Sequence, residues 1–590
     1  MTSLMALRSE NGKPSPARRW HRRDILASAA LFAATAAFIL WQNSQVAVLW
    51  DLSYLLDTSW RIALGQMPYR DFPLVHAPVT FLIQAAIMRV AGRHYYLQIA
   101  YAALAGGLGT VLAWGIVLRV LQGVRNAWAI SLILAAPLVF VGVYSIYPHP
   151  IYDGDCALAI LAALWMLQRL SGRDFSPASV RGQWVWPALT GAVVVLPVFF
   201  KQNMGLPFLF AVVSGIVLLL VSKWISARRG IPSIVGDTSR WLAILAAIAV
   251  ILPVTVALIQ ATAGLGNYLH WTVQFAAQRR LPGFATALAA YRDPTLLWTL
   301  PCAASGLLLL CLPIARRIWI QALAFCLFAA PFAGTFIFLL NDDDPGDRAD
   351  NLLSLWPMLL LLTAAVALLE LRKGITVPRL MPFFVLAAIQ GTFLSQSVNG
   401  STYAIWPLLI VLIAGALTAI PPSTQRLVPA LAATVSITFL VCGGLYAISH
   451  DRMDYIEIPD QPLARTTLPP LIGMADRGPY LPEFEELLRF AEREIPAQDG
   501  LLIFPGEDPF YFATGRTPQF PVLLFDPATD PYSPESLLAE ASKRNIHWVI
   551  VKTHRQSNED VMPRKAETLA LMQKEFRLYK RLTAYDVYRR

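Results

Sequence analysis

The stretch ILASAALFAATAAFILWQNSQVAVLWDLSYLLDTSWRIALGQMPYRDF, residues 25–72, decides the class of this protein. Residues 25–42 are apolar and come close to the roughly 20 residues that a membrane-spanning helix needs. The run is longer than the core of a signal peptide and no small-residue cleavage pattern follows it, so we expect a retained anchor. Asp51, Asp57 and Asp71 then follow beside bulky aromatic side chains. The chain therefore leaves a membrane and presents carboxylates at its surface.

The rest of the chain repeats the membrane signal. Of its 590 residues 56% are hydrophobic and 15% are charged, whereas about 25% is usual in soluble proteins. We expect a polytopic α-helical membrane protein. About thirteen segments are long and apolar enough to span, near 25–42, 96–119, 126–147, 155–170, 185–200, 205–226, 241–261, 295–313, 318–340, 351–369, 380–396, 403–420 and 427–449. The stretch 77–92, which contains Arg89, is typical of an interfacial helix.

The net charge of +10 is a topology signal. Basic pairs such as Arg22–Arg23 and Arg372–Lys373 fall in alternate loops, and the other loops hold most of the acids, including NDDDPGDRAD at 341–350. Because Lys and Arg favour cytoplasmic loops, this pattern predicts a cytoplasmic N-terminus and an outer C-terminus. It also argues against nucleic acid as a partner.

The composition divides the chain into three parts. Residues 1–23 form a basic cytoplasmic tail, 24–449 a membrane domain whose first outer loop is 43–95, and 450–590 a small extracytoplasmic α/β domain that begins with a Pro-rich linker. In the last part we expect helices in PEFEELLRFAEREI and in SPESLLAEASKRN, where Ser533 is the N-cap. We expect strands in GLLIFP, PVLLF and HWVIVK, and YKRLTAYDVYRR as a closing edge strand.

The first outer loop carries a recognisable pattern. Asp51 is followed by Tyr54, by GQMPYRD at 65–71, and by His76 and Pro78. This resembles the first outer loop of the GT-C glycosyltransferases, in the polyprenyl-phosphate-sugar branch that includes protein O-mannosyltransferases, aminoarabinose transferases of lipid A and RgtA/B/C/D-like proteins. The resemblance is most specific here and extends loosely, through span count and topology, over the chain.

Two positions depart from that pattern. Leu52 stands where the family often has a glutamate, which puts in doubt any help from a second acid in holding a metal. Asp57 has no counterpart in the motif. Taken singly, the acids of this loop are equally compatible with solvated loop residues.

The resemblance implies roles for three acids. Asp51 is the expected general base, because a carboxylate can take the proton of an acceptor hydroxyl as the new bond forms. Asp155, with Asp153, corresponds to the acid before the fourth span. Two acids at i, i+2 are also suited to a divalent cation such as Mg²⁺ or Mn²⁺. A glycine turn with solvated acids explains them equally well, so the metal stays unknown.

The third element is FFKQNMG, residues 199–205. Lys201 is a cation in a short outer loop, which points to a phosphate headgroup as its partner; a snorkelling interfacial lysine is the alternative. Gln202 and Asn203 are then placed to bond sugar hydroxyls. Arg70 and Arg280 are further candidates for the phosphate, although Arg280 fits a plain interfacial helix equally well.

The remaining candidates are substrate contacts: Tyr54, Tyr69, Asp71 and His76. Asp71 follows Arg70, so pairing with that residue to shape the turn is an alternative role. The lone His149, like His76, lies near the acids. Neither has two further ligands at metal spacing.

Elimination supports the same function. No phosphate-binding or dinucleotide-binding fingerprint is present, and the candidate residues face away from the cytoplasm, where nucleotide sugars are made. A transferase there needs a lipid-linked donor. We therefore expect transfer of a sugar from a polyprenyl phosphate to an extracytoplasmic glycan, lipid or protein, within membrane lipids of a bacterial inner membrane, with the C-terminal part in the periplasm.

Two other classes remain open. A transporter or flippase would place charges in mid-span and often has two related halves, but here the charges lie in outer loops and no repeat is evident. A structural protein that recruits a partner through residues 465–590 would leave the acidic first loop dispensable.

Overall fold

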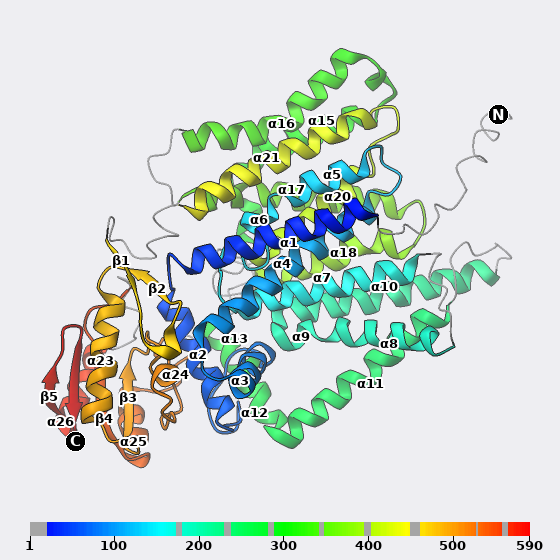
Figure 1. Cartoon of the computed structure of the whole chain (residues 1–590). Coiled ribbons are helices and arrows are strands. Elements are labelled where there is room, and N and C mark those ends of the chain that lie inside the picture. Colours follow the sequence, from blue (N-terminus) through cyan, green and yellow to red (C-terminus); the bar gives the residue numbers. More distant parts are fainter. Residues whose placement is uncertain are drawn as a thin grey trace.

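The computed structural model describes residues 21–172, 180–228, 238–280, 288–340, 347–394, 403–448, 461–526, 529–556 and 565–590. Up to residue 448 it is a helical bundle. From residue 461 it is a smaller unit of helices and strands, here called the C-terminal unit, which lies at one end of the bundle (Figure 1). Of the predicted tail 1–23, residues 1–20 lie outside the described part.

All named secondary-structure elements in the described part of the bundle are helices. Its elements are α1 (Arg22–Asn43), α2 (Leu49–Ala63), α3 (Val79–Ala91), α4 (Tyr95–Val120), α5 (Ala127–Ala135), α6 (Leu138–Val141), α7 (Tyr152–Ser171), α8 (Val180–Val195), α9 (Pro197–Phe200), α10 (Gln202–Arg228), α11 (Ser239–Thr262), α12 (Leu265–Leu269), the π-helix η2 (His270–Phe275), α13 (Ala276–Arg280), η3 (Ala289–Arg292), α15 (Leu296–Cys311), η4 (Pro313–Arg316), α16 (Ile318–Leu340), α17 (Asp347–Leu371), α18 (Val377–Thr392), η5 (Tyr403–Ile405), α20 (Trp406–Leu417), η6 (Gln425–Leu427) and α21 (Val428–Ala447).

Six helices of the described part are long and apolar enough to cross a membrane. They cover Arg22–Asn43, Tyr95–Val120, Gln202–Arg228, Ser239–Thr262, Ile318–Ile337 and Gln425–Ala447. Shorter apolar helices of 10–17 residues accompany them. This confirms a multi-pass helical membrane protein.

Neighbouring helices pack in pairs: α1 with α4, α8 with α11, α10 with α18, and α15 with α16. One predicted span differs from the expectation. Residues 126–147 do not form one helix, because α5 ends at Ala135 and α6 starts only after Pro137. Proline has no backbone N–H to continue the helical ladder, which accounts for the break.

The C-terminal unit contains a four-stranded sheet in the order β3-β4-β6-β5. Strands β3 and β4 are parallel, and the other pairs are antiparallel. Its elements are β1 (Leu463–Arg465), η7 (Pro469–Leu471), β2 (Ala475–Arg477), α23 (Tyr480–Glu494), β3 (Gly500–Phe504), α24 (Phe510–Thr514), α25 (Pro534–Lys543), β4 (Ile546–Lys552), α26 (Lys565–Glu575), β5 (Arg577–Arg581) and β6 (Tyr585–Arg589).

Several local predictions for this unit are confirmed. The helices of PEFEELLRFAEREI and SPESLLAEASKRN correspond to α23 and α25. The Ser533 hydroxyl caps α25 by accepting from the Ser536 N–H at 3.3 Å. The strands of GLLIFP and HWVIVK correspond to β3 and β4.

Two predictions for the unit are wrong. PVLLF is not a strand, because its backbone bonds elsewhere: the Pro521 carbonyl accepts from Arg61 at 2.6 Å, and the Phe525 N–H donates to the Pro505 carbonyl at 2.8 Å. YKRLTAYDVYRR is not one edge strand but most of a hairpin. A bond of 2.8 Å from the Leu582 N–H to the Tyr585 carbonyl closes its turn, which leaves β5 at the edge and β6 inside.

The C-terminal unit shares a hydrophobic core with the first outer segment. Leu49, Leu52 and Leu56 of α2 belong to the same buried cluster as Phe484 of α23 and Phe510 of α24. Figure 1 shows α2 and α24 side by side between the bundle and the sheet. The unit is therefore docked on the helix that carries Asp51.

Buried polar contacts fix this docking. The Asp57 carboxylate accepts the N–H groups of Tyr511 at 3.2 Å and Phe512 at 2.7 Å. The Arg61 guanidinium donates to the carbonyls of Phe520 at 3.2 Å and Pro521 at 2.6 Å. Both side chains are buried. Asp57, which the family motif does not explain, thus has a role in joining the two parts of the chain.

The start of α2 is held by a second contact. The Gln556 amide accepts from the Leu49 N–H at 2.9 Å and donates to the Ala47 carbonyl at 2.8 Å and to Asp476 at 2.5 Å. Its own backbone N–H donates to Glu507 at 2.8 Å. The C-terminal unit therefore fixes the backbone directly before Asp51.

Replacing Asp57 tests the docking. In Asp57→Ala the Tyr511 and Phe512 amides lose their acceptor, which costs about 1–3 kcal/mol and reduces their protection against hydrogen exchange about 5- to 150-fold. Hydrogen exchange measured by mass spectrometry on peptides that cover α24 gives this change in protection. Glu535→Ala, which removes an exposed acid of the same unit, is the control and should leave α24 unchanged. Unchanged protection in Asp57→Ala would contradict the assignment.

The docking should also depend on pH. Burial raises the pKa of Asp57 from its ordinary 3.8 to about 8. A carboxyl that holds its proton more tightly when docked favours docking below about pH 4 and loses that contribution as the pH rises through about 8. We expect the α24 protection factor, corrected for intrinsic exchange, to fall between about pH 5 and pH 9 in the wild type and to stay level in Asp57→Asn. An equal fall in both proteins would exclude Asp57 as the titrating group.

Candidate active site

Asp51 lies in the first turn of α2, where the helix dipole favours an acid. Its side chain is 31% exposed, and its Oδ2 atom is 3.7 Å from Nε2 of the buried His149. At that separation the two groups interact by charge when the imidazole is protonated. The structure therefore places one of the two histidines that the sequence indicates beside the expected base.

A row of aromatic side chains leads from α2 to Lys201 in the FFKQNMG segment. Tyr54, one turn after Asp51, has its hydroxyl 3.0 Å from His76 Nδ1. The His76 ring stacks on Tyr152 with 4.2 Å between centroids, and the Lys201 ammonium lies 5.4 Å from the Tyr152 centroid. Residues from the first loop, the second acidic loop and the loop before α10 thus meet at one end of the bundle.

Lys201 and Asp153 form a largely buried ion pair between Nζ and Oδ1. Pairing reduces the cost of keeping both groups charged away from water. An ammonium has three N–H donors, so Lys201 retains the capacity to bind a phosphate oxygen while it contacts Asp153. Asp153 thereby orients the candidate phosphate ligand.

Asp155 lies in a different environment from Asp153. It is 1% exposed and accepts hydrogen bonds from Thr80 at 2.7 Å, from Tyr101 at 2.7 Å and from Tyr144 at 2.5 Å. These hydroxyls come from α3, from α4 and from the segment that precedes α7. The carboxylate ties these elements together at the N-terminus of α7.

Arg70 and Asp71 close the turn that follows α2. The guanidinium donates to Asp71 at 2.8 and 3.0 Å, and the carboxylate also accepts the Met67 N–H at 2.7 Å. The hydrogen bond from Arg70 lowers the pKa of Asp71. The arrangement matches the alternative in which Asp71 pairs with Arg70 and shapes the turn.

Tyr69 occupies the left-handed region with φ of 68°, which is uncommon for a residue with a side chain. Its hydroxyl donates to the His76 carbonyl at 2.7 Å, and its ring packs edge-on against Tyr268. Tyr69 is buried and acts as a support for the loop that presents His76.

The amides of Gln202 and Asn203 bind the protein backbone. Gln202 donates to the Thr272 carbonyl at 3.0 Å, and Asn203 donates to the Gly391 carbonyl at 3.1 Å. A Cβ on Gly391 would lie 2.1 Å from the Asn203 carbonyl oxygen, so α18 can approach this closely only because residue 391 is glycine. These contacts hold the KQN segment and fix the position of Lys201.

The last candidate, Arg280, ends α13, but its side chain lies outside the described residues. Most of the acidic stretch 341–350 does so too. Within the described ranges, no three His, Cys, Asp or Glu side chains come together as a metal site would require.

Two residues that organise the site are not marked by the motifs of the sequence. Tyr152 stands between His76 and Lys201, and Gln556 fixes the start of α2. Tyr152 carries a local signal, since it directly precedes the acidic pair in HPIYDGD. Gln556 has none, because its partners at the start of α2, Leu49 and Ala47, lie about 500 positions earlier in the chain.

Comparison with known proteins identifies the fold. No family model and no curated sequence matches the chain. The crystal structure of ArnT from Cupriavidus metallidurans in the apo state matches with a TM-score of 0.53 at 12% identity, over 96% of this chain and 97% of that chain. The same protein bound to undecaprenyl phosphate gives a TM-score of 0.51 at the same identity and coverage. An Archaeoglobus fulgidus oligosaccharyltransferase in complex with Zn and sulfate reaches 0.47 at 12% identity, over 96% and 72%.

The likeness to ArnT extends over nearly the whole of both chains, including the C-terminal unit. At 12% identity it establishes the fold alone. The chain therefore has the fold of ArnT.

Proposed function

We propose that this protein is an integral-membrane glycosyltransferase that moves a sugar from a polyprenyl-phosphate donor to an acceptor hydroxyl on the outer face of the membrane. One observation carries the proposal. The partly exposed Asp51 carboxylate and the Lys201 ammonium lie at the same end of a bundle whose fold is that of a protein crystallised with undecaprenyl phosphate. A base and a phosphate ligand are the two groups that such a transfer needs.

The reaction is a single displacement with inversion. Asp51 takes the proton of the acceptor hydroxyl while the acceptor oxygen forms a bond to the anomeric carbon. The bond between that carbon and the phosphate oxygen breaks, and polyprenyl phosphate leaves with its added negative charge. Lys201 stabilises that charge.

The other residues position these two groups. Asp153 and Tyr152 hold the Lys201 ammonium, and His149 lies beside Asp51. Asp155 fixes the start of α7. Arg280 is proposed as a further phosphate ligand, and Tyr54 and His76 as acceptor or sugar contacts.

The orientation and the division into domains belong to the same proposal. The N-terminus faces the cytoplasm of a bacterial inner membrane. Residues 24–449 form the catalytic membrane domain, and 450–590 form a periplasmic domain. The pair Asp153 and Asp155 does not fit a divalent cation such as Mg²⁺ or Mn²⁺ in this arrangement, because Asp153 is paired with Lys201 and Asp155 accepts from three hydroxyls.

Replacing Asp51 tests the base. In Asp51→Asn we expect turnover to fall about 10²- to 10⁴-fold, the usual contribution of a general base, while the donor still binds. Mass spectrometry of lipids extracted from gently purified Asp51→Asn should therefore find a polyprenyl-phosphate sugar that the active wild type has consumed. Its mass also identifies the sugar.

Two outcomes of that experiment would contradict the proposal. Full transfer activity in a folded Asp51→Asn variant would exclude Asp51 as the general base. Bulk phospholipid alone in both samples, with another small solute enriched, would favour a transporter. Glu535→Gln, which neutralises an exposed acid of α25, is the matched control and should behave as the wild type does.

Replacing Lys201 tests the phosphate ligand. Loss of a charge-assisted hydrogen bond costs about 1.5–3 kcal/mol, so Lys201→Gln should lower kcat/KM for the lipid donor about 10- to 150-fold. Lys201→Arg keeps the charge and should recover part of the loss. Lys543→Gln, an exposed lysine of α25, is the control. Equal kcat/KM in Lys201→Gln and the wild type would show that Lys201 does not bind the donor phosphate.

A further inference from the structure

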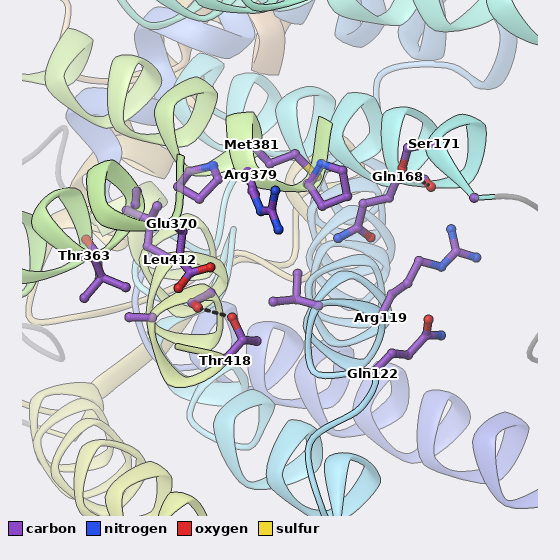
Figure 2. A pocket seen from close by; sticks show the side chains of 18 residues that line it. Arg119, Gln122, Gln168, Ser171, Thr363, Glu370, Arg379, Met381, Leu412 and Thr418 are labelled. Carbon is purple, nitrogen blue, oxygen red and sulfur yellow. Dashed lines mark hydrogen bonds between the residues drawn. The ribbon is translucent and has the colours of Figure 1, made fainter. Parts of the chain in front are cut away.

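A second polar cavity lies at the opposite end of the bundle from Asp51. Its volume is about 360 Å³, within the range of small-ligand sites. The walls come from the ends of α4, α7, α17, α18 and α20 (Figure 2). Gln168 of α7 lines it, 15 residues after Asp153, which places it about 22 Å along the same helix from that carboxylate. The cavity is therefore separate from the candidate active site.

One side of this cavity is cationic. Arg379 points into the space in Figure 2, and Arg119 lies at its edge. The Nη1 atom of Arg379 donates to the carbonyls of Lys373 at 2.8 Å and Gly374 at 3.0 Å. These bonds hold the planar guanidinium in place, and Nε and Nη2 carry its remaining donors. A fixed guanidinium is suited to a phosphate group.

The other side offers an acceptor. Glu370, paired with Lys373 at 2.5 Å, places a carboxylate across the space from Arg379. A phosphate has only acceptors and cannot donate to this carboxylate. Gln168 also lines the cavity, but its Nε2 atom donates to the Ile116 carbonyl at 3.4 Å and its Oε1 atom is enclosed by protein.

We propose that this cavity binds the headgroup of a membrane phospholipid that carries a hydrogen-bond donor beyond its phosphate, such as ethanolamine or glycerol. The phosphate binds Arg379 and Arg119. The ammonium or hydroxyl of the headgroup donates to the Glu370 carboxylate.

A lipid fits the surroundings better than a soluble phosphate. Apolar side chains, among them Met381 and Leu412, line the cavity beside its polar groups and match the start of acyl chains. The cavity lies at the basic face of the bundle, close to Arg372 and Lys373, where anionic headgroups concentrate.

Lipid competition tests the proposal on the full-length protein. Purified protein is stripped of lipid in detergent and offered phosphatidylethanolamine, phosphatidylglycerol or phosphatidylcholine with identical acyl chains, and bound lipid is counted by native mass spectrometry. Phosphatidylcholine has a phosphate but no N–H or O–H donor. We expect the ethanolamine and glycerol lipids to bind about tenfold more tightly than the choline lipid.

Two variants connect this preference to the cavity. Glu370→Met keeps the approximate volume of the side chain and removes the acceptor, so it should reduce the preference for the ethanolamine and glycerol lipids over the choline lipid. Arg379→Gln should weaken all three lipids about 10- to 150-fold. Arg372→Gln, an exposed arginine of the same face outside the cavity lining, should bind as the wild type does.

The proposal fails on any of three results. Equal binding of the three lipids by the wild type would show that the N–H or O–H donor of the headgroup does not contribute to binding. This measurement does not require any variant to fold. An unchanged preference in a stable Glu370→Met would locate the site elsewhere. Displacement of the lipid by phosphoethanolamine or glycerol 3-phosphate at similar concentration would make a soluble phosphate the ligand. None of these results depends on sugar transfer at the opposite face.

Discussion

The position of α2 is the constraint on which the outer face depends. An isolated helix of 15 residues is marginal in water, so contacts with the rest of the chain must hold it. Gln556 holds its start, Asp57 its middle and Arg61 its end, and each contact reaches into the C-terminal unit. Because Asp51 lies in the first turn, a shift of the C-terminal unit would move the candidate base. The unit is thereby part of the site without contributing a reacting group.

The two carboxylates at the start of α7 illustrate how environment separates roles. Asp153 is paired with the Lys201 ammonium, and Asp155 is satisfied by three hydroxyl donors. Each arrangement reduces the cost of burying a charge, but with a different consequence. The ion pair holds a cation that can share its donors with a ligand, whereas the hydroxyl cage leaves Asp155 with its acceptor sites occupied. Sequence spacing alone makes the two residues equivalent.

The sequence predicts what depends on local pattern. Apolar length predicts the spanning helices, and capping chemistry predicts α25 from Ser533. Contacts between distant segments have no such signature. PVLLF has the composition of a strand, yet Arg61 takes the carbonyl of Pro521 from about 460 positions away. The role of Asp57 likewise has no sequence signature, because its partners are backbone amides of α24, which no side-chain pattern marks.

Helix α7 connects the candidate active site with the cavity at the opposite end of the bundle. Its 20 residues extend about 30 Å, close to the hydrocarbon thickness of a bilayer. One end holds Asp153 and Asp155 beside Lys201, and the other holds Gln168 in the second cavity. A ligand at one end of a rigid helix can affect the site at the other end only if the helix can take two positions and the ligand binds them with different affinities. The three hydroxyl bonds on Asp155 oppose any such movement at the outer end, so a lipid in that cavity would stabilise the arrangement seen here without displacing the candidate base.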